Sequence, residues 1–189
     1  MIWQTLGFEN IKKYFDRVVG EDSLEHAYLF SGQEMIGKRS FALELGNKIA
    51  SREPSVDIVF SSTSSEKTVP TRSLDGFFPD LLLLENQVGI DEIRKLKTFL
   101  SFKPYSSRYK IAIIDNAHRM GADAANAMLK VLEEPPPHSL LILISANPSA
   151  LLPTVYSRCV EIKFAPHSRT DLLKHLEKLG LNQSQTEFL

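Results

Sequence analysis

The sequence predicts an α/β fold in which a five-stranded parallel sheet lies between helices. Short, almost continuously apolar runs alternate along the chain with segments whose apolar residues recur at helical spacing. This alternation is typical of a parallel sheet with helices on both faces, whose strands are buried on both sides. The predicted strands are residues 27–31, 80–85, 109–115, 140–145 and 160–164.

The helices are predicted from apolar residues that recur every three or four positions. They cover residues 6–19, 38–51, 89–102, 121–134 and 168–179. Asn10 is a candidate N-cap of the first helix. Residues 52–79 are rich in Ser, Thr and Pro with little periodicity, which predicts a surface insertion. We therefore expect one main domain over residues 1–166 and the start of a second, helical domain over residues 167–189.

The composition excludes several classes of protein. With 189 residues, 43% hydrophobic content and a net charge of -1, the chain is an ordinary globular protein whose overall field would not hold nucleic acid. Its one cysteine, Cys159, rules out an internal disulfide and a cysteine-rich zinc site, and it is expected to pack as a small apolar side chain. The first residues lack a secretory pattern and no apolar run reaches the length of a membrane span, so we expect a cytoplasmic protein.

A phosphate-binding loop is predicted between the first strand and the second helix. Gly32, Gly37 and Lys38 have the GxxxxGK spacing, in which backbone N–H groups cradle phosphates and the lysine neutralises them. The alternative is a helix-start loop with a solvated lysine. Ser or Thr normally follows that lysine and holds Mg²⁺, whereas Arg39 has no acceptor and is positively charged. Ser40 cannot substitute, because one residue along a helix turns the side chain by about 100°.

Polar residues follow two of the other predicted strands, at the edge of the sheet where ligands bind in such folds. Asp115 ends the third strand, where a P-loop ATPase keeps an acid for magnesium; otherwise it caps a turn. The next residue is Asn116, which cannot act as a general base. Asn147 follows the fourth strand and could contact a γ-phosphate or cap a turn before Pro148.

The remaining charged residues leave their roles open. Arg158 alone is compatible with an ordinary surface or ion-paired arginine. The five histidines lack metal-ligand spacing and are expected to be structural or exposed: His26, His118, His138, His167 and His175. A basic group on and after the third helix is either a solvated face or a DNA contact: Arg94, Lys95, Lys97, Lys103, Arg108 and Lys110.

The ordered motifs HAYLFSG, GxxxxGK, IIDNAHRM, AANAMLKVLEEPP and NPSALLPTVYSRC resemble the AAA+ clamp-loader ATPases of bacterial replication, the delta prime group of DNA polymerase III most of all. The resemblance covers residues 7–164. It implies a P-loop AAA+ fold that continues into a helical lid domain and a C-terminal collar domain. Many delta prime subunits carry a four-cysteine zinc module where this chain has residues 52–79, which hold no cysteine, so no zinc is predicted.

The resemblance also implies roles for single residues. Arg158, in the SRC tripeptide, would supply an arginine finger to the ATP site of a neighbouring subunit. Asn147 occupies the sensor-1 position, and residues 129–136 resemble a helix that packs against the phosphate loop. Arg39 and Asn116 are departures expected of a stator-like subunit with an impaired site, so ATP or ADP binding stays open and no intrinsic ATPase activity is expected.

These observations lead to one leading hypothesis and two alternatives. The leading hypothesis is a non-hydrolysing subunit of the replicative clamp loader, which loads the sliding clamp onto primed DNA together with motor ATPase and delta subunits. The first alternative is an active motor subunit that hydrolyses ATP with Lys38 and Asp115. The second is a nucleotide-binding AAA+ scaffold in another replication or repair complex.

Overall fold

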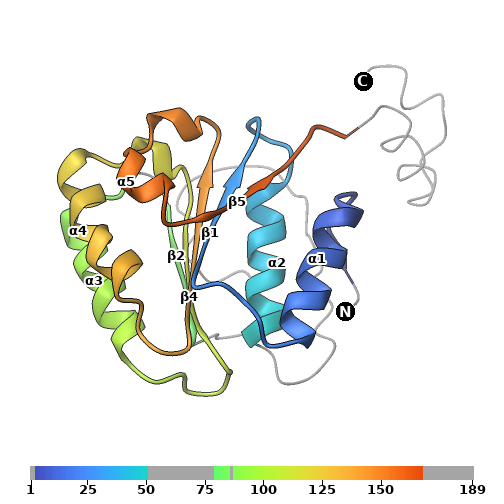
Figure 1. Ribbon diagram of the computed structural model, residues 1–189, viewed down its shortest axis with the longest axis horizontal. Coiled ribbons are helices and arrows are strands. Elements are labelled where there is room, and N and C mark those ends of the chain that lie inside the picture. Colours follow the sequence, from blue (N-terminus) through green and yellow to red (C-terminus); the bar gives the residue numbers. More distant parts are fainter. Residues whose placement is uncertain (1–2, 51–78, 86, 168–189) are drawn as a thin grey trace, which may run out of the picture.

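The computed structural model describes residues 3–50, 79–85 and 87–167, and it confirms the five-stranded parallel sheet (Figure 1). The strands lie in the order β2-β3-β4-β1-β5. Their bounds are β1 (Ala27–Ser31), β2 (Leu81–Leu84), β3 (Lys110–Ile114), β4 (Ser139–Ser145) and β5 (Val160–Lys163). Each strand begins and ends within one or two residues of its predicted bounds. The predicted surface insertion, apart from its last residue, and the predicted helix 168–179 lie outside the described residues.

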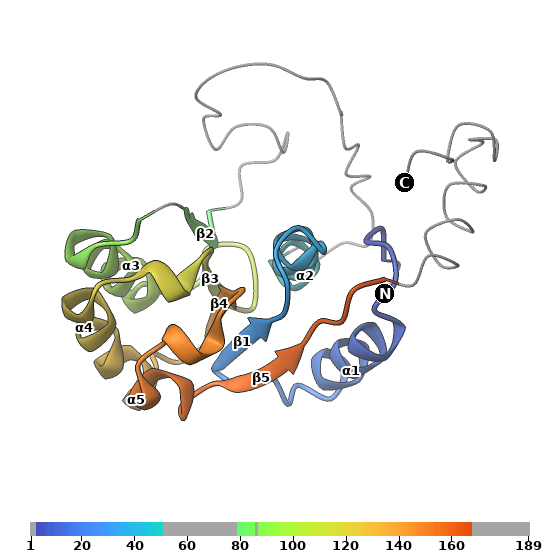
Figure 2. The ribbon, with the colours of Figure 1, turned by 90° about the horizontal axis from the view of Figure 1, so that it is seen from above.

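Helices cover both faces of the sheet, as Figure 2 shows from above. One face carries α1 (Glu9–Gly20) and α2 (Lys38–Ala50), and the other carries α3 (Ile90–Ser101), α4 (Ala122–Glu133) and α5 (Pro153–Tyr156). Short 3₁₀ turns follow two strands, η1 (Ala117–Arg119) after β3 and η2 (Pro148–Ala150) after β4. Within the described ranges, no helix is both long and apolar enough to cross a membrane.

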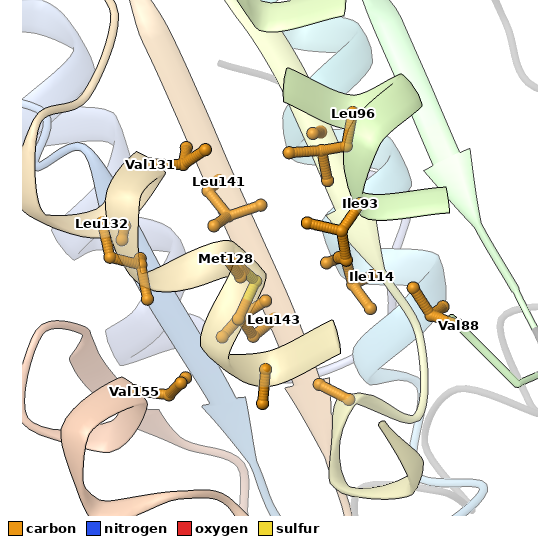
Figure 3. Packing of buried hydrophobic residues seen from close by; sticks show 14 of the residues in the cluster. Val88, Ile93, Leu96, Ile114, Met128, Val131, Leu132, Leu141, Leu143 and Val155 are labelled. Atoms are coloured by element: carbon orange, nitrogen blue, oxygen red, sulfur yellow. The ribbon is translucent and has the colours of Figure 1, made fainter. Parts of the chain in front are cut away.

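The alternation of side chains along β1 builds two separate cores. Tyr28 and Phe30 point into an aromatic core under α1 and α2, where the Phe30 and Phe41 rings lie 5.9 Å apart between centroids. Ala27 and Leu29 belong to the aliphatic core on the other face. Figure 3 shows part of that second core, in which Ile93 and Leu96 of α3 and Met128 of α4 meet strand residues such as Leu141 and Leu143. All five residues of β1 are buried, as are those of β3 and β4, so these three inner strands form the buried part of the sheet.

Two expectations about the elements were wrong. The LLLL run of β2 is half-buried rather than buried on both faces, because β2 is an edge strand that pairs only with β3. Asn10 is not the N-cap of α1, because the helix already begins at Glu9. The N-cap is Phe8, which has a φ of 59° and whose ring packs 4.7 Å from that of Phe164 between centroids. The aromatic core thus sets the start of the helix.

A buried carboxylate fixes the loop between α3 and β3. Asp80 is only 1% exposed and accepts backbone hydrogen bonds from Tyr105 at 2.7 Å, Ser106 at 2.8 Å and Ser107 at 2.9 Å. Lys110 Nζ lies 3.1 Å from Asp80 Oδ1 and is itself buried. Burial alone would raise the pKa of Asp80, but these N–H donors and the ammonium together hold it well below its usual value. Lys110 is therefore a structural residue and not part of an exposed basic face.

We predict that Asp80→Asn destabilises the domain strongly. The substitution leaves the Lys110 ammonium buried without its counter-ion and weakens the acceptor of the backbone N–H groups, which together cost about 3 kcal/mol. Urea denaturation at neutral pH measures the change in the free energy of unfolding. The matched control is Asp91→Asn, because the Asp91–Arg94 ion pair is about 70% exposed on both sides and should change stability by less than about 1 kcal/mol.

The same comparison has a defined pH dependence. An aspartate in an unfolded chain has a pKa of about 3.9, and the folded pKa of Asp80 lies below it. The carboxylate therefore stabilises the fold fully above about pH 4, and this contribution is lost as the pH falls toward the folded pKa. The difference between wild type and Asp80→Asn should stay constant between about pH 7 and pH 5 and shrink below about pH 4. A difference that already shrinks near neutral pH contradicts the assignment.

Candidate nucleotide site and the remote arginine

The predicted phosphate loop lies at the carboxyl end of β1, between that strand and α2. Two of its glycines have positive φ values, 144° at Gly32 and 98° at Gly37, which side-chain-bearing residues rarely adopt. A Cβ atom on Gly32 would also overlap the carbonyl oxygen of Phe164, just after β5. The loop is held there because Phe164 N donates to Ser31 O at 2.7 Å. Both glycines are thus required by the path of the loop, as a phosphate cradle needs.

Lys38 is the first residue of α2, and its side chain turns back into the loop. Its ammonium donates to the carbonyl oxygen of Gly32 at 2.7 Å and also to that of Gln33. The residue is only 6% exposed, and burial lowers the pKa of its amine, although nearby Asp115 and Glu34 act in the opposite direction. The structure therefore places a positive charge inside a loop framed by glycines at the start of a helix, an arrangement that fits a phosphate group.

Arg39 points away from this loop, toward the ends of two neighbouring strands. Its Nη2 forms an ion pair with Glu85 Oε1, and its Nε lies 3.9 Å from Asp115 Oδ2. Glu85 directly follows β2 and Asp115 directly follows β3, and the two strands pair in register up to Leu84 and Ile114. Sequence reasoning had used Glu85 only as a strand boundary. Only the register of the edge strand brings it to Arg39, 46 residues away.

Arg158 lies elsewhere in the domain, just before β5. Val160 pairs with Tyr28 near the start of β1, whereas the phosphate loop follows the end of that strand. Tyr28 and Gly32 are four residues apart, so at about 3.3 Å per residue the start of β5 and the phosphate loop lie about 13 Å apart along the strand direction. The guanidinium donates to Thr154 O at 2.8 Å and to Glu133 Oε1 at 2.8 Å, and its side chain is 35% exposed. Arg158 is therefore not part of this chain's own phosphate loop.

Comparison with known proteins identifies the family. The family described as DNA polymerase III, delta subunit, matches residues 7–168. The chain belongs to the AAA+ clamp-loader family of DNA polymerase III. This clamp-loader domain is 30% identical over 176 residues to subunit tau of Bacillus subtilis (strain 168), covering 92% of this chain and 31% of the relative. It is 34% identical over 141 residues to subunit delta' of Pseudomonas aeruginosa, covering 72% and 42% respectively.

A solved structure supports the same assignment. The crystal structure of a DNA polymerase III gamma subunit-related protein from Thermotoga maritima superposes with a TM-score of 0.63 at 26% identity, covering 88% of this chain and 52% of that one. The chain thus spans between 31% and 52% of the length of these three relatives. The match includes subunits named tau, gamma and delta', so it establishes the clamp-loader family but not which kind of subunit this is.

The other polar residues of the clamp-loader domain have local contacts. Asn116 has a φ of 53°, and its backbone N–H donates to Asp115 Oδ1 at 2.9 Å. The side-chain oxygen of Asn147 accepts a hydrogen bond from Ser149 Oγ at 2.8 Å, and although Asn147 precedes η2, its side chain makes no capping hydrogen bond to that turn. A sensor role for Asn147 stays a prediction. Asn147 and Asp115 both follow carboxyl ends of strands at the edge of the sheet that carries the phosphate loop.

The segment 129–136 does not pack against the phosphate loop, so that expectation was wrong. Its helical part belongs to α4, whose buried residues contact α3, α5 and the aliphatic core, whereas the loop adjoins the aromatic core on the other face. The separation arises because α4 covers one face of the sheet, whereas α2, which the phosphate loop enters, covers the other. The end of α4 instead approaches Arg158 through Glu133.

Neither a reactive thiol nor a metal cluster is found near these residues. Cys159 is half-buried against the aliphatic core, and burial raises the pKa of its thiol to about 12, so it is protonated at neutral pH. No cluster of three or more His, Cys, Asp or Glu side chains suited to a metal ion occurs in the part of the chain that the structure describes.

We predict that Gly32→Ala destabilises the domain by more than about 2 kcal/mol, because it combines an unfavourable φ with an overlap against backbone. Thermal unfolding monitored by circular dichroism measures the change. The matched control is Gly20→Ala at the end of α1, where a Cβ meets nothing within 4 Å and should be neutral or slightly stabilising. Equal melting temperatures for the two variants contradict the close approach of the loop to Phe164.

Proposed function

We propose that this protein is a non-hydrolysing, stator-like subunit of the bacterial replicative clamp loader that presents Arg158 to the ATP site of a neighbouring subunit. The observation that carries the proposal is the position of Arg158. The residue lies at the amino end of β5, remote from the chain's own phosphate loop, with its guanidinium partly exposed. Arginine fingers offered in trans stabilise the charge that develops on another chain's nucleotide during phosphoryl transfer.

The ion pair between Arg158 and Glu133 is compatible with this role. Both side chains are partly exposed, so the pair contributes at most about 1 kcal/mol and can be exchanged for a phosphate at low cost. The bond to Thr154 O orients the guanidinium from within α5. A planar, permanently charged group with several donors suits the bidentate recognition of phosphate.

The chain's own nucleotide site supports a subunit without turnover. Asp115, the only acid in the magnesium-associated position, is approached by Arg39 rather than by a hydroxyl. The following residue, Asn116, cannot accept a proton from an attacking water at neutral pH. The loop, Gly32, Gly37 and Lys38 keep the frame for phosphate binding, so we propose that ATP or ADP can be held there without being hydrolysed.

We further propose that this subunit works in the cytoplasm, as one member of an assembly with motor ATPase and delta subunits. Through that assembly it would contact the sliding clamp and primed DNA. The Lys110–Asp80 pair removes one residue from the basic group considered for DNA contact, and Arg94 and Arg108 are paired with Asp91 and Asp22.

We predict that Arg158→Ala in the full-length protein lowers the DNA-stimulated ATPase rate of the reconstituted clamp loader by at least about a hundredfold at the site it serves. Steady-state ATPase measurements on loaders with the wild-type or variant subunit test this. The matched control is Arg94→Ala, another exposed, ion-paired arginine, which should leave the rate unchanged. Both variants should keep their melting temperatures and assemble normally. Equal rates for wild type and Arg158→Ala reject the finger role.

The retained frame of the phosphate loop is the one feature that favours an active motor subunit. The two functions differ in a loader whose other ATP sites have been disabled by substitution. We predict no turnover above background in that assembly, because Arg39 and Asn116 stand where a cation ligand and a general base are needed. Turnover that disappears in Lys38→Ala would establish the motor function instead.

A further inference from the structure

The feature that the proposed function leaves unexplained is the side chain of Arg39. An arginine that merely replaced a lost hydroxyl could point into solvent, but this one reaches across to β2 and β3. It forms an ion pair with Glu85 and approaches Asp115 to 3.9 Å. Its side chain is 50% exposed, compared with 40% for Glu85 and 19% for Asp115, so the three groups form a partly exposed cluster.

The register of the edge strand makes this arrangement specific. Leu84 pairs with Ile114, and Asp115 N donates to Leu84 O at 2.9 Å, so Glu85 and Asp115 occupy equivalent positions on adjacent strands. Adjacent strands lie about 4.8 Å apart. Two carboxylates on neighbouring strand ends repel each other, and a cation that contacts both relieves the repulsion. Carboxylate oxygens next to a hydroxyl are also the ligands that Mg²⁺ prefers.

A divalent ion does not fit beside the residues that are present. The guanidinium is planar, carries donors only and stays charged at any accessible pH, so it neutralises the carboxylates and offers no ligand. An Mg²⁺ ion near Asp115 would have to displace it and would meet its positive charge. The adjacent Lys38 points the other way, into the loop. The Lys38 side chain therefore supplies a positive charge to the phosphate loop, and the Arg39 side chain supplies one to the two carboxylates.

We propose that Arg39 is an internal counter-ion that takes the place of the divalent cation, so that the phosphate loop binds a nucleoside polyphosphate without metal. This inference rests on the part of the proposed function that assigns nucleotide holding without hydrolysis. It adds that Glu85 and Asp115 together hold Arg39 in that position. The site then binds ATP or ADP without a metal ion, and Mg²⁺, which complexes free nucleotide in solution, does not tighten that binding.

The test is a comparison of wild type with Arg39→Thr, which restores a hydroxyl after Lys38 and frees the two carboxylates. The Arg39 pairs are partly exposed and contribute little to stability, so the variant should fold. A fluorescent ATP analogue is titrated with either Mg²⁺ or a chelator present. Wild type should bind it no more tightly with Mg²⁺ than with the chelator. Arg39→Thr should bind it at least about tenfold more tightly with Mg²⁺ than with the chelator.

A second readout follows the cation itself. Mn²⁺ is titrated into each protein with the analogue present, and the electron paramagnetic resonance signal of free Mn²⁺ counts the bound ions. We expect one additional bound Mn²⁺ in Arg39→Thr and none in Arg39→Lys, which keeps the positive charge. Arg94→Thr is the matched control on an unrelated surface and should behave as wild type. If the double variant Arg39→Thr/Glu85→Gln binds less Mn²⁺ than Arg39→Thr alone, the result supports the role of Glu85.

Three results would overturn the inference. They are wild-type binding that Mg²⁺ tightens about tenfold, a wild-type Mn²⁺ site equal to that of Arg39→Thr, and no binding of the analogue to wild type. None of them bears on the arginine finger, which is measured on the neighbouring subunit's ATP site through Arg158. If Arg158→Ala lowers the ATPase rate of the loader while Mg²⁺ tightens nucleotide binding to the wild-type subunit, the arginine-finger role is retained. In that case only the counter-ion role of Arg39 is rejected.

Discussion

The pairing of β1 with β4 on one side and β5 on the other is the constraint on which the rest of the domain depends. All five residues of β1 are buried, and their side chains alternate between the aromatic core and the aliphatic core. Because β1 is held on both edges, the loop that leaves it has one path, close enough to Phe164 that Gly32 has no room for a Cβ atom. The register with β5 places Arg158 near the start of the same strand. A single strand thus positions both the phosphate loop, which follows its carboxyl end, and Arg158, which lies near its amino end through the pairing with β5.

The electrostatics of the site follow from the same parallel arrangement. The carboxyl ends of β2 and β3 bring Glu85 and Asp115 to one edge, and the amino end of α2 brings Lys38 and Arg39 to it. Successive residues of a helix point about 100° apart. Lys38 therefore turns into the glycine loop while Arg39 turns toward the acids. Arg39 is thus paired with Glu85 and lies near Asp115, while Asp115 and Glu34 both act on the amine of Lys38.

The sequence predicted the sheet well because its strands are almost continuously apolar and separated by helical periodicity. The prediction from sequence was wrong where the burial, cap or ion pair of a residue depends on residues far away in the chain. The LLLL run could not reveal that β2 is an edge strand, because burial on one or two faces depends on strand order. The N-cap of α1 is Phe8 rather than the predicted Asn10, because the ring of Phe8 packs against that of Phe164. Lys110 looked like part of a basic face because its partner, Asp80, lies 30 residues away in the chain.

In the candidate site, too, residues in local motifs could be predicted from the sequence, whereas a contact that depends on strand pairing could not. Gly32, Gly37, Lys38 and Asp115 were predictable, because their spacing and their positions after strands are local properties. Glu85 was not, because its contact with Arg39 depends on the pairing of β2 with β3. That contact changes the meaning of Arg39. In the sequence Arg39 stands in place of a magnesium ligand. In the structure it is a cation placed against Glu85 and against Asp115, the acid in the magnesium-associated position. Under the proposed function, a subunit that does not hydrolyse ATP has no requirement for a metal that activates water or stabilises a leaving group. It can still use a fixed charge to keep its phosphate loop and two strand ends together, which preserves the frame of the site while removing its chemistry.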